Sequence, residues 1–161
     1  MINPQRLTAT MEGNFVVFMM GMPINRPWMV HKRLPLVSAM PLMLDELYRQ
    51  PESGFVYAEM WFSRTTVMVQ YWRSMHALLA YATDREAQHL PAWQAFNRAV
   101  GVDGTVGIWH ETYAAKQGSC ENVDVNMPAF GLGKAGDLVQ ATGARTSARG
   151  RLSAAPPPAS P

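Results

Sequence analysis

The stretch FVYAEMWFSRTTVMVQYW, residues 55–72, decides the fold of this chain. It holds two runs rich in β-branched and aromatic residues, 55–62 and 65–72, which are typical of strands. Only Ser63 and Arg64 separate the two runs, a spacing that suits a hairpin. We therefore expect an antiparallel pair of strands at the centre of the fold.

Side chains of the second run alternate between two faces of the predicted sheet, as in any strand. Because the period is two, each face carries a different set of chemical groups. The faces hold Val67, Val69 and Tyr71 on one side, and Met68, Gln70 and Trp72 on the other.

Further elements are expected on both sides of this hairpin. Residues 13–22 are almost all apolar and predict a strand buried on both faces. Residues 35–49 repeat Leu and Met at helical spacing, and Pro41 is expected to kink that helix or mark its first turn. Ser74 is a good N-cap for a second helix. The rest of the pattern predicts a short helix from Pro91, a strand over 106–115 and a short strand over 121–126.

This order of elements predicts an α+β fold. It is close to the split βαβ, ferredoxin-like arrangement, an antiparallel sheet with helices on one face. The bare face carries large side chains, so a second copy of the chain is expected to cover it. We expect a polar lead-in over residues 1–12, one domain over 13–133, and a disordered Ala/Pro/Arg tail over 134–161.

Composition excludes several functional classes. The chain of 161 residues is 48% hydrophobic and only 16% charged, against about 25% charged in an average domain. Its net charge of +2 comes from the tail, because residues 134–161 carry +3 and residues 1–133 carry −1. The domain thus lacks the basic stripe of a nucleic-acid-binding protein. We expect no nucleic-acid partner.

The single cysteine, Cys120, excludes an internal disulfide framework and a cysteine zinc cluster. No apolar run approaches the roughly 20 residues of a membrane span, and no secretory signal is recognised. A cytoplasmic protein with no membrane partner is expected.

Six stretches together resemble the monooxygenase-like family that includes a small enzyme of fumagillin biosynthesis. They are FVVFMMGMPINRPWMVHKRLP (15–35), PESGF (51–55), TTVMVQYWRS (65–74), HLPAWQAFNRAVG (89–101), VGIWHETY (106–113) and NVDVNMPAFGLG (122–133). The family lies within the dimeric α/β-barrel superfamily, alongside antibiotic-biosynthesis monooxygenases. The resemblance implies a ferredoxin-like protomer that pairs sheet to sheet as a homodimer, with a pocket between its sheet and its helices. Some relatives oxidise polycyclic aromatics with no metal or flavin and others bind haem through a histidine, so we expect no cofactor and keep haem open.

His89 precedes the predicted short helix from Pro91 and is the first candidate for a general base or haem ligand. Its neighbours Trp93 and Phe96 share a helical face with it, and Asn97 follows. The alternative is a histidine that only anchors the loop.

His110 is the second candidate catalytic residue. Strand alternation puts it on one face with Ile108 and Thr112, whereas Trp109, Glu111 and Tyr113 share the opposite face. His110 and Glu111 therefore cannot act on the same substrate. His110 is expected to line the pocket or to serve a structural or dimer role.

Several aromatic and polar residues are candidates for substrate binding, with Trp93, Phe96, Asn97 and Trp109 among them. Trp72, after Tyr71, is expected either to line the pocket mouth or to pack between sheet and helix. Arg26 is expected to pair with a substrate anion or with an internal carboxylate, that of Glu59 or Glu111. Trp28 is expected to cover the pocket or to pack at the dimer seam.

Three functions are compatible with these residues. The first is a small monooxygenase-like enzyme that oxidises an apolar, natural-product-type substrate. The second is a haem enzyme of the same superfamily, such as a dehydratase or peroxidase-like protein. The third is a dimeric, non-catalytic binder of a small hydrophobic molecule.

Overall fold

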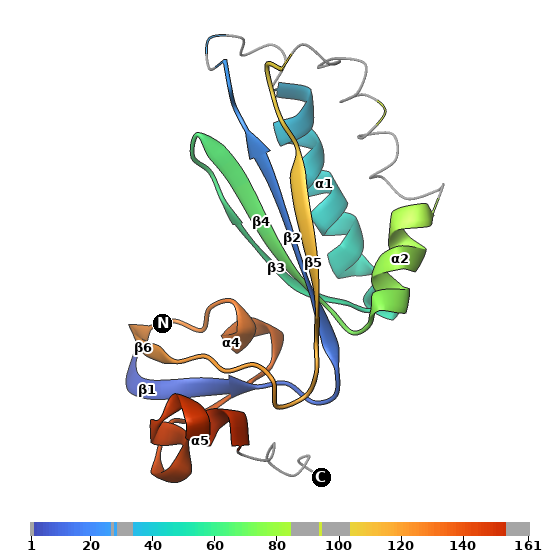
Figure 1. The fold of residues 1–161 in the computed structure, drawn as a ribbon. Coiled ribbons are helices and arrows are strands. Elements are labelled where there is room, and N and C mark those ends of the chain that lie inside the picture. Colours follow the sequence, from blue (N-terminus) through green and yellow to red (C-terminus); the bar gives the residue numbers. More distant parts are fainter. Residues whose placement is uncertain (1, 27, 29–33, 85–93, 95–103, 154–161) are drawn as a thin grey trace.

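The computed structural model describes residues 2–26, 28, 34–84, 94 and 104–153, with the backbone alone at 34–39. Four strands form the main sheet in the order β3-β4-β2-β5, and every neighbouring pair is antiparallel. Helices α1 (Leu34–Arg49) and α2 (Met75–Thr83) lie on one face of this sheet (Figure 1). The strands are β2 (Phe15–Pro23), β3 (Phe55–Trp61), β4 (Thr65–Trp72) and β5 (Trp109–Ala115). The predicted α+β, ferredoxin-like sheet with helices on one face is thereby confirmed.

Side-chain alternation gives the main sheet two chemically different faces. We call the face beneath α1 and α2 the inner face and the opposite one the outer face. Three rows cross the inner face from β3 to β5. They are Met60–Met68–Met20–His110, Ala58–Gln70–Phe18–Thr112 and Phe55–Trp72–Val16–Ala114. The main core lies at the third row, where Val16, Phe55 and Trp72 pack with helix residues Leu47 and Leu78.

The helices follow local sequence signals. Helix α1 continues through Pro41, which lies in its interior and not in its first turn. Ser74 caps α2 as predicted, because its side-chain oxygen accepts a hydrogen bond of 3.1 Å from the backbone N–H of Ala77. The short helix predicted from Pro91 falls outside the described residues. None of the described helices has both the length and the apolar character needed to cross a membrane.

A second, smaller sheet has the strand order β6-β1-β7 and lies at one end of the main sheet (Figure 1). It consists of β1 (Asn3–Thr10), β6 (Asp124–Met127) and β7 (Asp137–Gln140), joined by α4 (Leu132–Ala135). Two 3-10 turns, η2 (Pro51–Ser53) and η3 (Gly143–Thr146), and helix α5 (Ala148–Ser153) complete the chain's described elements.

This sheet differs from the predicted lead-in over 1–12 and the predicted disordered tail from residue 134. Strand β1 pairs with β7 from Leu7↔Gln140 to Thr10↔Asp137, so the two segments satisfy each other's backbone hydrogen bonds. Neither segment has a strong strand pattern of its own, and the partner lies about 130 residues away in sequence. Such a long-range pairing leaves no local signal.

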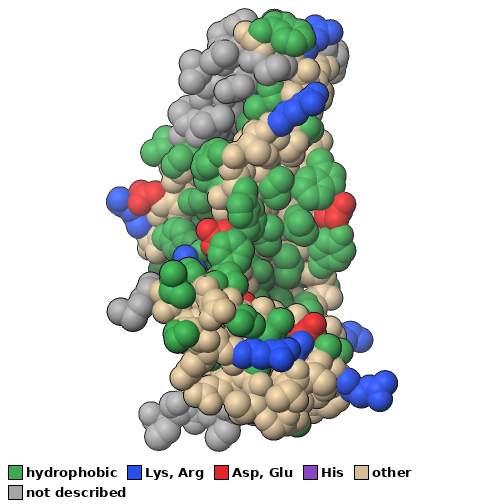
Figure 2. Space-filling view, turned by 90° about the vertical axis from the view of Figure 1, so that its left-hand side faces the viewer, with side chains coloured by type: hydrophobic (Ala, Val, Ile, Leu, Met, Phe, Trp, Pro, Cys, Tyr) green, Lys and Arg blue, Asp and Glu red, His purple; other side chains and the backbone are tan. Residues whose placement is uncertain are grey.

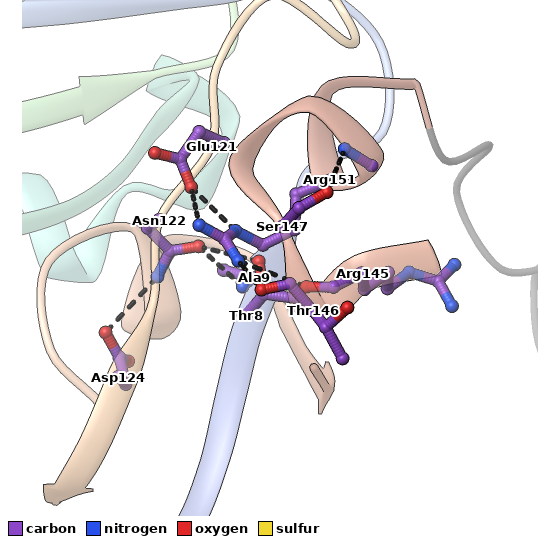
Figure 3. A network of polar contacts seen from close by, with 10 residues as sticks. Thr8, Ala9, Glu121, Asn122, Asp124, Arg145, Thr146, Ser147 and Arg151 are labelled. Carbon is purple, nitrogen blue, oxygen red and sulfur yellow. Dashed lines mark hydrogen bonds and ion pairs between the residues drawn. The ribbon is translucent and has the colours of Figure 1, made fainter. Parts of the chain in front are cut away.

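A polar network fixes the last described residues to the small sheet (Figure 3). The Arg151 side chain is only 6% exposed and donates from Nε to Glu121 Oε2 at 2.6 Å. Its Nη1 also donates to the carbonyl oxygens of Arg145 and Thr146, at 3.1 and 3.2 Å. The basic residue that suggested a solvated tail is therefore part of a buried junction.

Candidate functional site

A cavity of about 490 Å³ lies between the inner face and the two helices. This volume is in the range of small-molecule sites. Apolar side chains from four segments dominate the lining, and four polar side chains interrupt it. The apolar side chains include Phe18, Met20, Met43, Leu78, Leu79 and Ile108. The polar ones are Gln70, Tyr81, His110 and Thr112.

His110 reaches the cavity because it lies at an inner-face position of β5. Its cross-strand partner on β2 is Met20, and its ring centroid lies 5.8 Å from that of Phe18, with the planes at 42°. An imidazole beside an apolar space is a suitable proton acceptor for an apolar substrate. The predicted face for Ile108, His110 and Thr112 is confirmed.

Gln70 and Trp72 form a hydrogen-bonded pair beneath the cavity. Trp72 is fully buried between Phe55 and Tyr81, with ring centroids 5.4 and 5.5 Å away. Its indole Nε1 donates to Gln70 Oε1 at 2.9 Å, and Gln70 Nε2 lies 3.6 Å from Met68 Sδ. Trp72 is thus a core residue that does not line the cavity itself and is hydrogen-bonded to Gln70, which does.

Tyr81 contributes a phenol to the helix side of the cavity. Its hydroxyl donates to Glu46 Oε2 on α1 at 3.5 Å. Burial, followed by the nearby Glu46 carboxylate, raises the pKa of the Tyr81 phenol. Tyr81 therefore stays protonated at neutral pH and is a donor, not a base.

The outer face has a different chemistry, and no helix of the described chain covers its centre. On β5, the Glu111 carboxylate accepts hydrogen bonds from Tyr113 Oη and from Trp109 Nε1, the latter at 2.9 Å. These two hydrogen bonds lower the pKa of the Glu111 carboxyl, and the bond from Tyr113 has the larger effect. The Trp109 ring lies over Gly21, where an added Cβ would approach Trp109 Cε3 to 2.7 Å.

The predicted site residues are divided between the cavity, the outer face and the surface. His89, Trp93, Phe96 and Asn97 fall outside the described residues, as does His31. Of the others, only His110 lines the cavity.

Trp72, Trp109 and Tyr71 do not lie where substrate binding was predicted. The structure places Trp72 in the core, which agrees with the alternative that it packs between sheet and helix and not with a place at the pocket mouth. Tyr71 and Trp109 occupy odd-numbered positions of their strands and therefore point to the outer face. Trp109 thus lies opposite His110, as the predicted alternation has it, and neither Tyr71 nor Trp109 lines the cavity that holds His110.

Arg26 and Trp28 lie in the exposed segment after β2, where Trp28 is 74% exposed. The predicted internal ion pair of Arg26 is not formed with either carboxylate. Glu59 instead lies 4.0 Å from Lys134 Nζ, and Glu111 is held by its aromatic neighbours.

Gln70, Tyr81 and Thr112 are polar cavity residues that sequence reasoning missed as site residues. The available signal was alternation, because Gln70 is a polar residue between Met68 and Trp72 on a face otherwise rich in apolar side chains. Within the described part of the chain, no three metal-ligating side chains of His, Cys, Asp or Glu lie together.

Comparison with known proteins identifies the family. A family model described as Monooxygenase af470-like matches residues 15–132, which include all four strands of the main sheet and most of the cavity's described lining. The chain belongs to the Monooxygenase af470-like family. The resemblance to a monooxygenase-like family is thereby confirmed, and the family name is that of an oxidoreductase.

A curated member of the Monooxygenase af470-like family, Monooxygenase af470 of Aspergillus fumigatus, is 28% identical over 132 residues. The match covers 76% of this chain and 46% of that protein, so the chain spans about half the length of this relative.

Among solved structures, an aldoxime dehydratase is similar to the chain with a TM-score of 0.59 and 17% identity. The match covers 83% of this chain and 42% of that one, and it supports the fold alone. SnoaB, a cofactor-independent oxygenase from Streptomyces nogalater, has a TM-score of 0.47 at 18% identity, over 65% of this chain and 95% of that one.

Proposed function

We propose that this chain is a small monooxygenase-like enzyme that oxidises an apolar, natural-product-type molecule in the inner-face cavity. The observation that carries the proposal is the cavity itself, which joins about 490 Å³ of mostly apolar space to the imidazole of His110. Membership of the Monooxygenase af470-like family supplies the reaction class. An apolar lining with a few polar groups favours a ligand that is mostly hydrocarbon.

The chemistry needs a substrate that forms a stabilised carbanion. In the proposal, His110 Nε2 or Nδ1 accepts a proton from an activated C–H group, and the carbanion then transfers electrons to O₂. For a doubly benzylic CH₂ beside a carbonyl-bearing ring system, one oxygen atom becomes a new carbonyl. The other oxygen leaves as water with the two hydrogens of that CH₂, so the substrate supplies all four electrons. His89, the other predicted base, remains a candidate outside the described residues.

Oxygen uptake with anthrone, a tricyclic ketone of this type, tests the proposal. We expect the protein to consume one O₂ per anthrone and to form anthraquinone faster than heat-inactivated protein does. His110→Gln should slow the reaction about 100-fold or more, as expected for loss of a general base. His76→Gln is the matched control, because His76 is exposed on α2 and does not line the cavity.

The same purified protein also tests the two alternative functions, a non-catalytic binder and a haem enzyme. Anthrone binding without oxygen uptake would contradict the enzyme and support a non-catalytic binder. A Soret band after expression with added haem would support the haem enzyme, and one imidazole suffices as a proximal ligand. In that case His110 is the described cavity residue able to hold haem, which would supply oxidation or dehydration chemistry.

We further propose a homodimer that pairs through the outer face. Figure 2 shows hydrophobic side chains gathered in the middle of this face. Trp61, Trp109 and Tyr113 are large side chains that remain between 37% and 52% exposed there. An exposed cluster of this kind is typical of an interaction surface. Glu59, which also lies on this face, already has Tyr57 and Lys134 as partners, and this lowers the cost of covering its charge.

Light scattering on the purified chain tests the dimer. Val69 lies in the central row of the outer face, opposite Met19 of β2 and Glu59 of β3. We expect a dimeric mass for the unaltered protein and a monomeric one for Val69→Arg. The control His76→Arg adds the same charge to α2 and should remain dimeric. A monomer at micromolar concentrations of the unaltered chain would contradict the pairing.

We also propose a cellular location for this protein. The single cysteine, Cys120, is free and exposed, which suits a reducing environment. We accordingly assign the enzyme to the cytoplasm.

A further inference from the structure

Gln70 is a buried polar residue on the mostly apolar inner face of the sheet. It is 4% exposed, and its cross-strand partners on the inner face are Phe18 of β2 and Ala58 of β3. Its side chain nevertheless contributes to the cavity lining. A buried carboxamide requires hydrogen-bond partners for both of its ends.

Trp72 fixes which end of the Gln70 carboxamide faces which way. The indole Nε1–H can only donate, so the atom 2.9 Å from it must be the Gln70 oxygen. Trp72 is fully buried and held between two aromatic rings, so this donor cannot turn away. The amino group of Gln70 is therefore held in one orientation.

The amino group has far weaker partners than the oxygen. Its nitrogen lies 3.6 Å from Met68 Sδ, and a thioether is a weak acceptor. The amino group carries two N–H bonds, and within the described part of the chain it makes no other hydrogen bond. Among the described residues, at least one N–H of this cavity-lining side chain thus has no acceptor, an arrangement that costs stability unless a ligand provides one.

We propose that Gln70 is the hydrogen-bond donor that selects an oxygen-bearing substrate in this cavity. The ligand class is a mostly apolar ring compound whose carbonyl, enolate or phenolate oxygen accepts from Gln70 Nε2. The inference rests on the proposed function in taking this cavity as the substrate site. It goes further by naming the residue and the functional group that it recognises.

The same contact would assist the reaction. When a C–H group next to a conjugated carbonyl loses its proton, negative charge moves onto the carbonyl oxygen. A preorganised donor aimed at that oxygen stabilises the charge as it develops. On β2, Met20 pairs with His110, and Phe18, the next inner-face residue, pairs with Gln70. The base His110 and the donor Gln70 therefore lie on neighbouring rows of the inner face.

Equilibrium dialysis with 9-fluorenone and fluorene tests the inference without turnover. The two probes share one ring system and differ in the carbonyl oxygen. We expect the unaltered chain to bind fluorenone more tightly than fluorene, and Gln70→Met to lose about 3- to 10-fold of affinity for fluorenone alone. Gln140→Met is the matched control, because Gln140 is an exposed glutamine of the small sheet. It should bind both probes like the unaltered chain.

A second variant distinguishes loss of the hydrogen bond to the ligand from misfolding of the chain. Gln70→Met leaves the buried Trp72 N–H without an acceptor, whereas Gln70→Met combined with Trp72→Phe removes both members of the pair. The double variant should keep fluorene binding and lose the preference for fluorenone. The infrared carbonyl band of bound fluorenone should shift to lower frequency only when Gln70 is present.

Equal affinity of fluorenone for the unaltered chain and for both variants would overturn the inference. So would an unshifted carbonyl band in the unaltered chain. Neither result depends on oxygen uptake, so failure of the proposed enzyme activity is distinguishable from failure of the Gln70 assignment.

Discussion

Replacing Trp72 with Phe removes one hydrogen-bond donor from the interior and keeps an aromatic ring in the core. Trp72 is fully buried and Gln70 is only 4% exposed, so the Gln70 oxygen that the indole now satisfies would lose its donor in the interior. An orphaned buried acceptor costs about 1–3 kcal/mol. The smaller ring leaves a cavity beside Phe55 and Tyr81, which adds about 1 kcal/mol. We expect the free energy of unfolding to fall by about 2–4 kcal/mol in total.

A double-mutant cycle separates the hydrogen bond from the packing. In a Gln70→Met background no carboxamide oxygen remains to be orphaned, and Trp72→Phe also removes the indole N–H that Gln70→Met leaves without an acceptor. The Phe replacement should therefore cost no more than the packing contribution of about 1 kcal/mol there. The expected coupling between the two positions is therefore about 1–3 kcal/mol. Urea unfolding, followed by circular dichroism at equal protein concentration, measures the free energy of unfolding of the unaltered chain, the two single variants and the double variant. Additive costs would refute the argument that Trp72 holds the Gln70 carboxamide.

Three further perturbations test other parts of the structure. Arg151→Ala should lower the free energy of unfolding by about 1–3 kcal/mol in urea, because it removes charge-assisted hydrogen bonds; an unchanged midpoint would contradict the buried junction. Gly21→Val should cost about 1–3 kcal/mol, because its side chain would collide with the Trp109 ring. In a Trp109→Ala background that cost should vanish, whereas a cost that remains would show that the added side chain collides with a group other than Trp109. Burial raises the pKa of Asp124, whose Oδ2 has no hydrogen-bond partner, so this residue favours folding at low pH and disfavours it as pH rises through the folded-state pKa. Asp124→Asn should therefore stabilise the chain by about 1 kcal/mol at pH 7 and progressively less toward pH 4, whereas a pH-independent difference would contradict the assignment.

Local sequence patterns were sufficient for the main sheet. The hairpin around Ser63 and Arg64, the cap at Ser74 and the alternation along 108–112 each depend on neighbours close in the chain. These signals also placed His110 and Gln70 correctly on sheet faces. They did not show that both residues share one cavity, because that requires the register across Phe18 and Met20.

Long-range contacts account for the differences from prediction. Strand β1 is completed by β7, and Arg151 is buried only because Glu121 lies beside it in space. The place of Trp72 at a strand end left a pocket role and a packing role open, and helix α2 decides for packing because its Tyr81 lies against the Trp72 ring. In each case the deciding neighbour is absent from the local pattern.

Labelling with ¹⁸O₂ tests the central claim most directly. The unaltered protein, incubated with anthrone under ¹⁸O₂ in ordinary water, should form anthraquinone that carries one ¹⁸O atom, detected by mass spectrometry. His110→Gln should form labelled product much more slowly, and His76→Gln should match the unaltered chain. Product without the label, or labelled product formed no faster than with heat-inactivated protein, would contradict a monooxygenase that works in this cavity.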